Sequence, residues 1–110
     1  MNLADAATRR ALETFITKAA AATAAGITAY RRLSGGAIQE NHVIDVTLEG
    51  GLLTGHQRWV VRCDAPSAVA VSLTRAQEFA VLQAAHAAGV KVPAPLWCSR
   101  LGGDEFFIMD

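Results

Sequence analysis

Apolar residues near the start of the chain recur at helical spacing. The residues that share this spacing are Leu12, Phe15, Ile16, Ala19, Ala20 and Thr23. The pattern predicts one amphipathic helix over about residues 4–24, which Gly26 can stop. Its apolar face must pack on another element.

The next three segments alternate apolar and polar residues, as strands do. They cover residues 27–33, 41–49 and 57–63, and glycine-containing turns at 34–36 and 50–55 separate them. In the second segment, one face carries His42, Ile44, Val46 and Leu48. In the third, one face carries Trp59, Val61 and Cys63, and the other carries Arg58, Val60 and Arg62. Three antiparallel strands are the simplest assignment.

A second helix and two more strands complete the prediction. Asp64-Ala65-Pro66-Ser67 ends the third strand, and Thr74 with Gln77 forms a capping box for a helix that runs to Gly89. Residues 92–99 and 105–110 read as strands around a turn at 102–104, and Pro93 and Pro95 confine the first to an edge or to its ends. The predicted fold class is α+β: a five-stranded antiparallel sheet with a helix after strand three and an extra N-terminal helix.

The helix after the third strand carries an acidic residue toward the sheet. At 100° per residue, Val81, Leu82 and Ala85 form the buried face, with Phe79 at its margin and Glu78 at its centre. A buried carboxylate needs a partner, and Arg62 on the preceding strand is the candidate cation. The alternative is a helix rolled so that Glu78 lies at the edge of this face.

Composition narrows the function classes. The 110 residues fit one domain (1–26 helix, 27–110 the remainder), and 52% hydrophobic content with only 6% aromatic residues predicts a small core. Ten basic and ten acidic residues cancel, which argues against a nucleic-acid or membrane partner. Without an 18-residue apolar run, and with Asp5, Arg9 and Arg10 where a signal peptide would be apolar, a cytoplasmic location is expected.

The cysteines and histidines are not spaced like a metal site. Cys63 and Cys98 lack a C-x-x-C motif or a histidine spaced for zinc, and they read as buried apolar groups. His42, His56 and His86 are scattered over a strand, a turn and a helix. No metal ligand is therefore predicted.

The loop between the first two strands carries Gly35, Gly36 and Ala37. Glycines between strands free backbone N–H groups to hold an anion, because no Cβ blocks the approach of a phosphate. An ordinary hairpin turn is the alternative interpretation.

Taken in order, these features resemble the small lobe of the protein-kinase fold, and the aminoglycoside phosphotransferase family in particular. The resemblance covers about residues 30–110 and rests on Leu33-Ser34-Gly35-Gly36-Ala37, Trp59-Val60-Val61-Arg62, Arg75-Ala76-Gln77-Glu78-Phe79-Ala80-Val81-Leu82, Ala88-Gly89-Val90-Lys91-Val92-Pro93-Ala94-Pro95-Leu96 and Phe106-Phe107-Ile108-Met109-Asp110. Many relatives carry Ser-Asn where this chain has Ile38-Gln39.

The resemblance implies a nucleotide-binding role for seven residues. Gly35, Gly36 and Ala37 would lie over the phosphates of ATP or GTP with Mg²⁺. Arg62 would meet the α and β phosphates, and Glu78 would hold it. Met109 would back the adenine pocket, and the main chain of Asp110 would begin the hinge. Protein kinases have Lys at the place of Arg62, but Arg looks common in this family and supplies a permanent charge and a planar fork.

The family's catalytic His-Gly-Asp and Asn and its metal-binding Asp belong to a C-terminal lobe that would begin after Asp110. This chain alone is therefore expected to be inactive, to bind no nucleotide tightly, and to have its small-molecule acceptor pocket in the missing lobe. Its exposed lobe interface would favour self-association. The alternative function is a non-enzymatic α+β interaction or dimerisation module whose glycine loop is only a turn.

Overall fold

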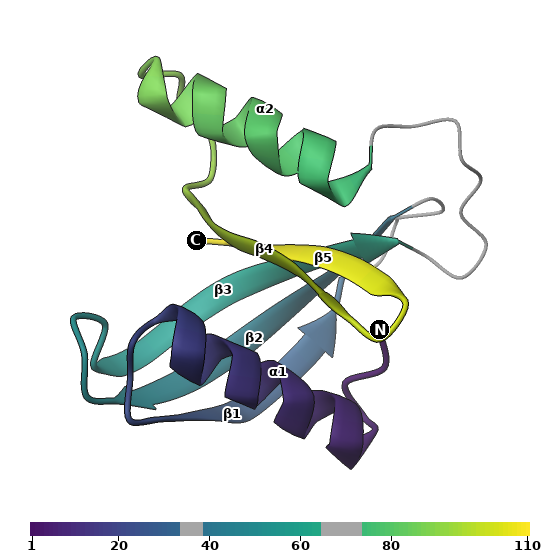
Figure 1. Ribbon diagram of the computed structural model, residues 1–110, viewed down its shortest axis with the longest axis vertical. Helices are drawn as coiled ribbons and strands as arrows, with labels where there is room; N and C mark the ends of the chain where they lie inside the picture. Colours follow the sequence, from purple (N-terminus) through teal and green to yellow (C-terminus); the bar gives the residue numbers. More distant parts are fainter. Residues whose placement is uncertain (34–38, 65–73) are drawn as a thin grey trace.

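The computed structural model describes residues 1–33, 39–64 and 74–110. Its elements follow one another in the order that the sequence predicts (Figure 1). They are α1 (Ala6–Ala19), β1 (Ala24–Arg32), β2 (Gln39–Glu49), β3 (Gly55–Asp64), α2 (Arg75–Ala87), β4 (Pro95–Leu101) and β5 (Asp104–Met109). The α+β class is confirmed, with a helix at the N-terminus and another after strand three.

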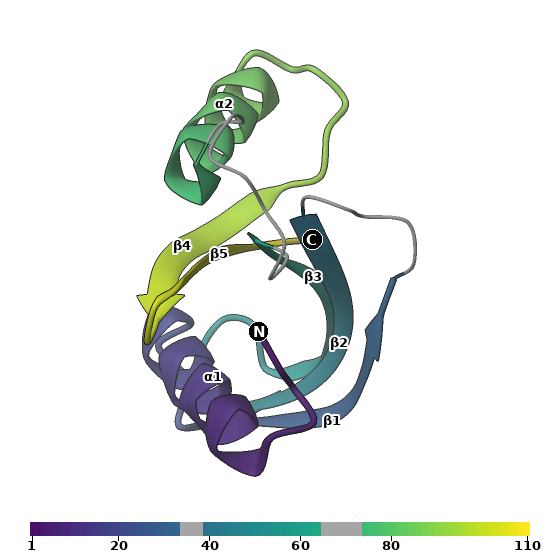
Figure 2. The same cartoon turned by 90° about the vertical axis from the view of Figure 1, so that its right-hand side faces the viewer.

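The strands form one antiparallel sheet in the order β1-β2-β3-β5-β4. The last strand of the chain therefore lies between β3 and β4, and β4, which begins at Pro95, is an edge strand as its prolines predict. Cys63 and Cys98 lie on strands that β5 separates, and both are free thiols. The sheet curls around α1 (Figure 2).

The main core lies between α1 and the sheet. The alternation predicted for β2 and β3 is confirmed, because the residues predicted for their inner faces are all buried. Phe15 on α1 meets Phe106 on β5 edge-on at 5.3 Å between ring centroids, and Trp59 meets Trp97 at 5.2 Å. The buried cluster consists of Leu3, Leu12, Ile16, Ile44, Val46, Leu48, Trp59, Val61, Cys63, Phe106 and Ile108.

The first helix ends earlier than predicted. It stops at Ala19, Ala21 has a left-handed φ of 51°, and Gly26 lies inside β1 instead of ending the helix. Ala24 and Ala25 pair with the end of β2, so sheet pairing overrides the helical preference of this alanine-rich stretch.

The turn after β2 packs against this early helix end, and the contact requires glycine. Gly51 has a φ of 79°, and a Cβ there would lie 2.9 Å from the carbonyl oxygen of Ala21. Gly50 is equally restricted, because its Cβ would lie 2.6 Å from Oγ1 of Thr23. The turn can approach α1 this closely because neither position carries a side chain.

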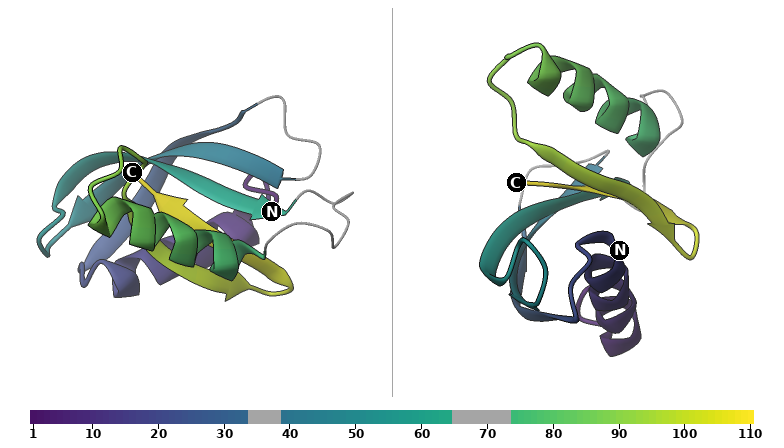
Figure 3. Two further views of the ribbon diagram at one scale, coloured as in Figure 1. Left: turned by 90° about the horizontal axis from the view of Figure 1, so that it is seen from above. Right: turned by 60° about the vertical axis from the view of Figure 1, so that its left-hand side comes forward.

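Helix α2 lies on the other side of the sheet from α1 (Figure 3). The predicted capping box of Thr74 and Gln77 is present. Glu105 on β5 adds a further cap, since its Oε1 accepts a hydrogen bond of 2.7 Å from the backbone N–H of Ala76. Three groups outside the helix or at its first turn therefore fix the start of α2.

No helix in residues 1–33, 39–64 and 74–110 is long and apolar enough to cross a membrane.

The roll of α2 differs from the prediction. Val81, predicted on the buried face, is 58% exposed, whereas Phe79 lies inward with its ring 5.7 Å from that of Phe107. Arg75 is fully buried and starts a face that continues through Glu78, Phe79, Leu82 and Ala85. The ion pairs of Arg75 and the ring contact of Phe79 determine how α2 is rotated about its axis. This rotation leaves Val81 exposed instead of packed against the sheet.

The same substitution at two valines tests this assignment of faces. Val61→Ala removes two methyl groups from a fully buried position and is expected to lower the free energy of unfolding by about 2 kcal/mol. Val81→Ala removes them from an exposed helical position, where alanine is the better helix former, so the change should stay within about 0.5 kcal/mol. Urea unfolding followed by circular dichroism measures both, and equal losses would contradict the roll of α2.

Candidate functional site

Arg62 and Glu78 form an ion pair that joins β3 to α2. The Nε atom of Arg62 lies 2.7 Å from Oε1 of Glu78, and the side chains are 27% and 22% exposed. The prediction that Glu78 turns toward the sheet and meets Arg62 is confirmed. The ion pair is partly exposed to solvent, so its net contribution to the free energy of unfolding is about 1 kcal/mol or less.

A second arginine takes part in this network. Arg75, in the first turn of α2, has no exposed side-chain surface, and its Nη1 donates a 3.0 Å hydrogen bond to the same Oε1 of Glu78. Its Nε lies 3.1 Å from Oδ1 of Asp64 at the end of β3. Two guanidinium groups and two carboxylates thus balance, and a buried cation has the partners that its burial requires.

The side chain of Gln39 also holds Arg62. Its Oε1 accepts a hydrogen bond from Nη2 of Arg62. Glu78 and Gln39 therefore hold the guanidinium from two sides, which fixes the direction of a group that carries five N–H donors. Asn41 is the cross-strand neighbour of Arg62, and its buried Oδ1 has no hydrogen-bond partner among the described residues.

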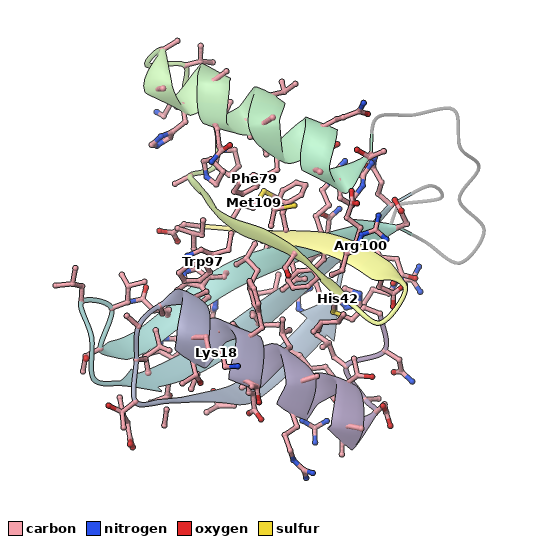
Figure 4. The ribbon with its side chains drawn as sticks, in the orientation of Figure 1. Lys18, His42, Phe79, Trp97, Arg100 and Met109 are labelled. Carbon is pink, nitrogen blue, oxygen red and sulfur yellow. The ribbon has the colours of Figure 1, made fainter. Side chains whose placement is uncertain are left out.

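Apolar side chains continue this face of the sheet beyond Arg62. Val60 lies two residues before Arg62 and pairs with Val43 on β2 and Met109 on β5. All three are partly exposed, unlike their neighbours on the α1 side. Figure 4 shows Met109 together with Phe79 between α2 and the sheet, and His42 on the opposite side of the sheet. The face therefore combines an oriented cation with a partly exposed apolar surface.

The seven residues proposed for nucleotide binding are only partly placed. Arg62, Glu78 and Met109 belong to this one face, whereas Gly35, Gly36 and Ala37 lie outside the described residues, between the ends of β1 and β2. The backbone N–H of Asp110 donates a 2.9 Å hydrogen bond to the carbonyl of Ala94. A ligand contact through the main chain of Asp110 would therefore use its carbonyl oxygen.

Sequence reasoning missed Arg75 and Gln39. Arg75 sits one residue after the N-cap, where an arginine normally reads as a solvated charge. Arg75 lies three residues before Glu78, and residues three apart share a helix face, so this spacing could have indicated the contact between them. Gln39 gave no such signal, because its contact depends on the register of β2 against β3.

The structure brings together two residues that the sequence places far apart. His42 and Cys63 lie on one buried face with Glu40, and their potential ligand atoms all lie within 4.8 Å of one another. Glu40 is the cross-strand partner of Cys63, and His42 follows Glu40 by two residues. The spacing that matters here runs across two strands, so a search for local C-x-x-C or histidine motifs could not detect it.

Comparison with protein-family models, curated proteins and solved structures finds no match to this chain.

Removing Glu78 should cost more stability than removing Arg62. In Glu78→Gln both arginines lose a carboxylate, and Arg75 stays buried, so we expect a loss of about 2 kcal/mol. In Arg62→Met, Glu78 keeps Arg75, and the loss should be about 1 kcal/mol or less. Urea midpoints measure both values.

The exposed Arg58, which pairs with Asp45 at 2.8 Å and is 70% exposed, supplies the matched control. Arg58→Met should change stability by less than about 1 kcal/mol. If Arg62→Met proves as costly as Glu78→Gln, the network does not have the arrangement described.

Proposed function

We propose that this chain is the nucleotide-phosphate-binding lobe of an ATP- or GTP-dependent phosphotransferase that phosphorylates a hydroxyl group of a small molecule, as in the aminoglycoside phosphotransferase family that the sequence resembles. The observation that supports this proposal best is the 2.7 Å ion pair between Arg62 on β3 and Glu78 on α2. It is the side-chain contact that the resemblance requires, and it forms without nucleotide.

The ion pair suits the chemistry of phosphoryl transfer. Catalysis of this reaction depends mainly on positioning and on neutralising charge, so a cation must stand at a fixed place. Glu78 and Gln39 orient the guanidinium of Arg62 before any phosphate arrives. Its planar fork can then meet phosphate oxygens through more than one hydrogen bond.

The proposed adenine contacts lie on the same face of the sheet. Val43, Val60 and Met109 offer partly exposed apolar surface of the kind that lines ligand pockets. The carbonyl of Asp110 lies at the end of β5, next to Met109, and can accept a hydrogen bond from an adenine amino group. The phosphates would then extend toward Arg62 and the loop that carries Gly35, Gly36 and Ala37.

The proposal assigns Mg²⁺, the catalytic base and the acceptor pocket to a C-terminal lobe that this chain does not contain. The proposed location is the cytoplasm, where ATP and GTP are abundant. Because the base and the metal-binding carboxylates are assigned elsewhere, the chain by itself contributes binding of nucleotide and not turnover.

Weak, localised nucleotide binding is the first expected result. Titration of ¹⁵N-labelled protein with Mg-ATP and with Mg-GTP should give fast-exchange shifts with millimolar affinity, because the chain supplies only half of an adenine pocket. The shifts should centre on Gly35, Gly36, Ala37, Arg62 and Met109. Arg62→Met should weaken binding at least about tenfold, since hydrogen bonds to charged groups contribute about 1.5–3 kcal/mol.

The matched control is Arg58→Met, on the same strand and the same face but four residues away. It should leave nucleotide affinity unchanged. An equal loss in both variants would show non-specific attraction of charge, and the absence of any shift at millimolar nucleotide would favour the interaction-module alternative. Either result overturns the proposal.

The second expected result is the absence of turnover. In a coupled assay for ADP release, the purified chain with Mg-ATP should match a heat-inactivated control. Sustained ADP release that disappears in Arg62→Met would show that the chain carries its own base and metal ligands, contrary to the division of roles proposed here.

A further inference from the structure

Three side chains with metal-binding atoms meet on the α1 side of the sheet. Glu40 and His42 come from β2, and Cys63 comes from β3 directly opposite Glu40. Glu40 and His42 are each 5% exposed, and Cys63 is fully buried. Because alternate residues of a strand face the same side and cross-strand partners lie side by side, the strand register itself gathers the three groups.

The distances approach those of a tetrahedral zinc site. Zinc binds histidine nitrogen and carboxylate oxygen at about 2.0–2.2 Å and thiolate sulfur at about 2.3 Å, so neighbouring ligand atoms stand about 3.3–3.6 Å apart. Nε2 of His42 is 3.2 Å from Oε2 of Glu40, which is close to one edge of such a tetrahedron. Sγ of Cys63 is 4.0 Å from the same Oε2, and a small change of side-chain rotamer would close this gap.

The surroundings orient two of these groups. His42 is buried, and its Nε2, a nitrogen that commonly binds metals, faces Oε2 of Glu40 at 3.2 Å. Arg32 lies 3.4 Å from Oε1 of Glu40, so the carboxylate is held through one oxygen while Oε2 points to His42 and Cys63. Such support of a ligand by an outer group is typical of metal sites.

A cavity gives access to the cluster. It measures about 930 Å³, and Glu40 and His42 lie in its wall with Met1, Asp64 and Asp104. The N-terminal ammonium of Met1 is 3.8 Å from Oε2 of Glu40 and 3.9 Å from Sγ of Cys63. A metal ion that enters from the cavity must displace this ammonium from the carboxylate and the sulfur, after which a water molecule can complete its coordination.

We propose that Glu40, His42 and Cys63 form a zinc-binding site with three protein ligands and a fourth position open to the cavity. The mixed nitrogen, sulfur and oxygen set suits zinc better than magnesium or calcium, which prefer oxygen ligands alone. Binding converts the Cys63 thiol to a zinc-bound thiolate and releases its proton to solvent. The thiolate is the form that binds a metal, so zinc must displace this proton.

The zinc site is independent of nucleotide binding. Glu40, His42 and Cys63 lie on the face of β2 and β3 that packs toward α1. Asn41 and Arg62, which are the next residues along these strands, lie on the opposite face. By joining β2 to β3, the metal would brace the strand ends next to residues 34–38. If no zinc binds, the nucleotide proposal is unaffected. If no nucleotide binds, the zinc proposal is unaffected.

Cobalt substitution tests the site. Tag-free protein, reduced and freed of metal with a chelator that is then removed, is titrated with Co²⁺. We expect a thiolate-to-cobalt charge-transfer band and the strong visible bands of tetrahedral cobalt, saturating at one equivalent and bleached by one equivalent of Zn²⁺. Zinc affinity is then measured by competition with a chromophoric chelator, and thermal unfolding should shift to higher temperature with zinc.

The variants separate this site from adventitious binding. His42→Ala and Cys63→Ser should each lose the cobalt spectrum or weaken zinc binding by more than the roughly 10–100-fold change expected for an outer-shell partner. Glu40→Gln provides a third test that retains side-chain volume if Cys63→Ser fails to fold. Cys98→Ser and His56→Ala, whose side chains lie outside the cluster, should bind as the unmodified chain does.

Several outcomes overturn the proposal. One is the absence of a charge-transfer band at excess Co²⁺, which would mean that Met1 and Arg32 already satisfy the cluster as a metal-free polar network. Another is a band that Cys98→Ser abolishes and Cys63→Ser does not. Equal weakening in His56→Ala and His42→Ala would likewise show binding at scattered surface groups.

Discussion

The register between β2 and β3 is the constraint on which the rest of the structure depends. Glu40 faces Cys63, Asn41 faces Arg62 and Ile44 faces Trp59 across this strand pair. Because successive residues point to opposite sides, a shift by one residue would bury Arg62 in the core and expose Trp59. The buried apolar residues therefore hold in place both the polar cluster on one face and the oriented arginine on the other.

The second constraint is electrostatic, and it positions α2. The helix covers the sheet through Phe79 and a few smaller contacts, so its apolar burial is modest. The fully buried Arg75 links Glu78 within the helix to Asp64 on β3. Leaving this cation without partners would cost several kcal/mol, which makes the ion-pair network a requirement for docking of α2 in this position.

The two faces of the sheet carry different groups of polar residues, because α1 and α2 cover them to different extents. The α1 face is largely covered by the core, so its polar residues are partnered by one another and by nearby charges, as Glu40, His42 and Cys63 are. The α2 face is only partly covered, so Val43, Val60 and Met109 remain accessible beside an arginine whose direction Glu78 controls. A shift of α2 would therefore move the cation as well, which connects the packing of the helix to the proposed binding of phosphate.

Local patterns in the sequence were sufficient for the order and the faces of most elements. Alternation along 41–49 and 57–63 identified the inner residues of β2 and β3, the Thr74 capping box located the start of α2, and the prolines near 95 marked an edge strand. These features depend on residues within one or two turns of each other, so propensity and periodicity specify them directly. Helical geometry also predicted that Glu78 faces the sheet, but its contact with Arg62 depends on how α2 packs on β3.

The remaining features depend on contacts between segments that are distant in the chain, and only the tertiary structure determined them. Helix α1 ends at Ala19 because Ala24 and Ala25 pair with β2, and Val81 is exposed because Arg75 and Phe79 set the roll of α2. The meeting of Glu40, His42 and Cys63 requires that residues 23 positions apart be brought opposite each other by strand register. Periodicity shows which side of an element is buried, but only the packed fold determines which residues share that buried space.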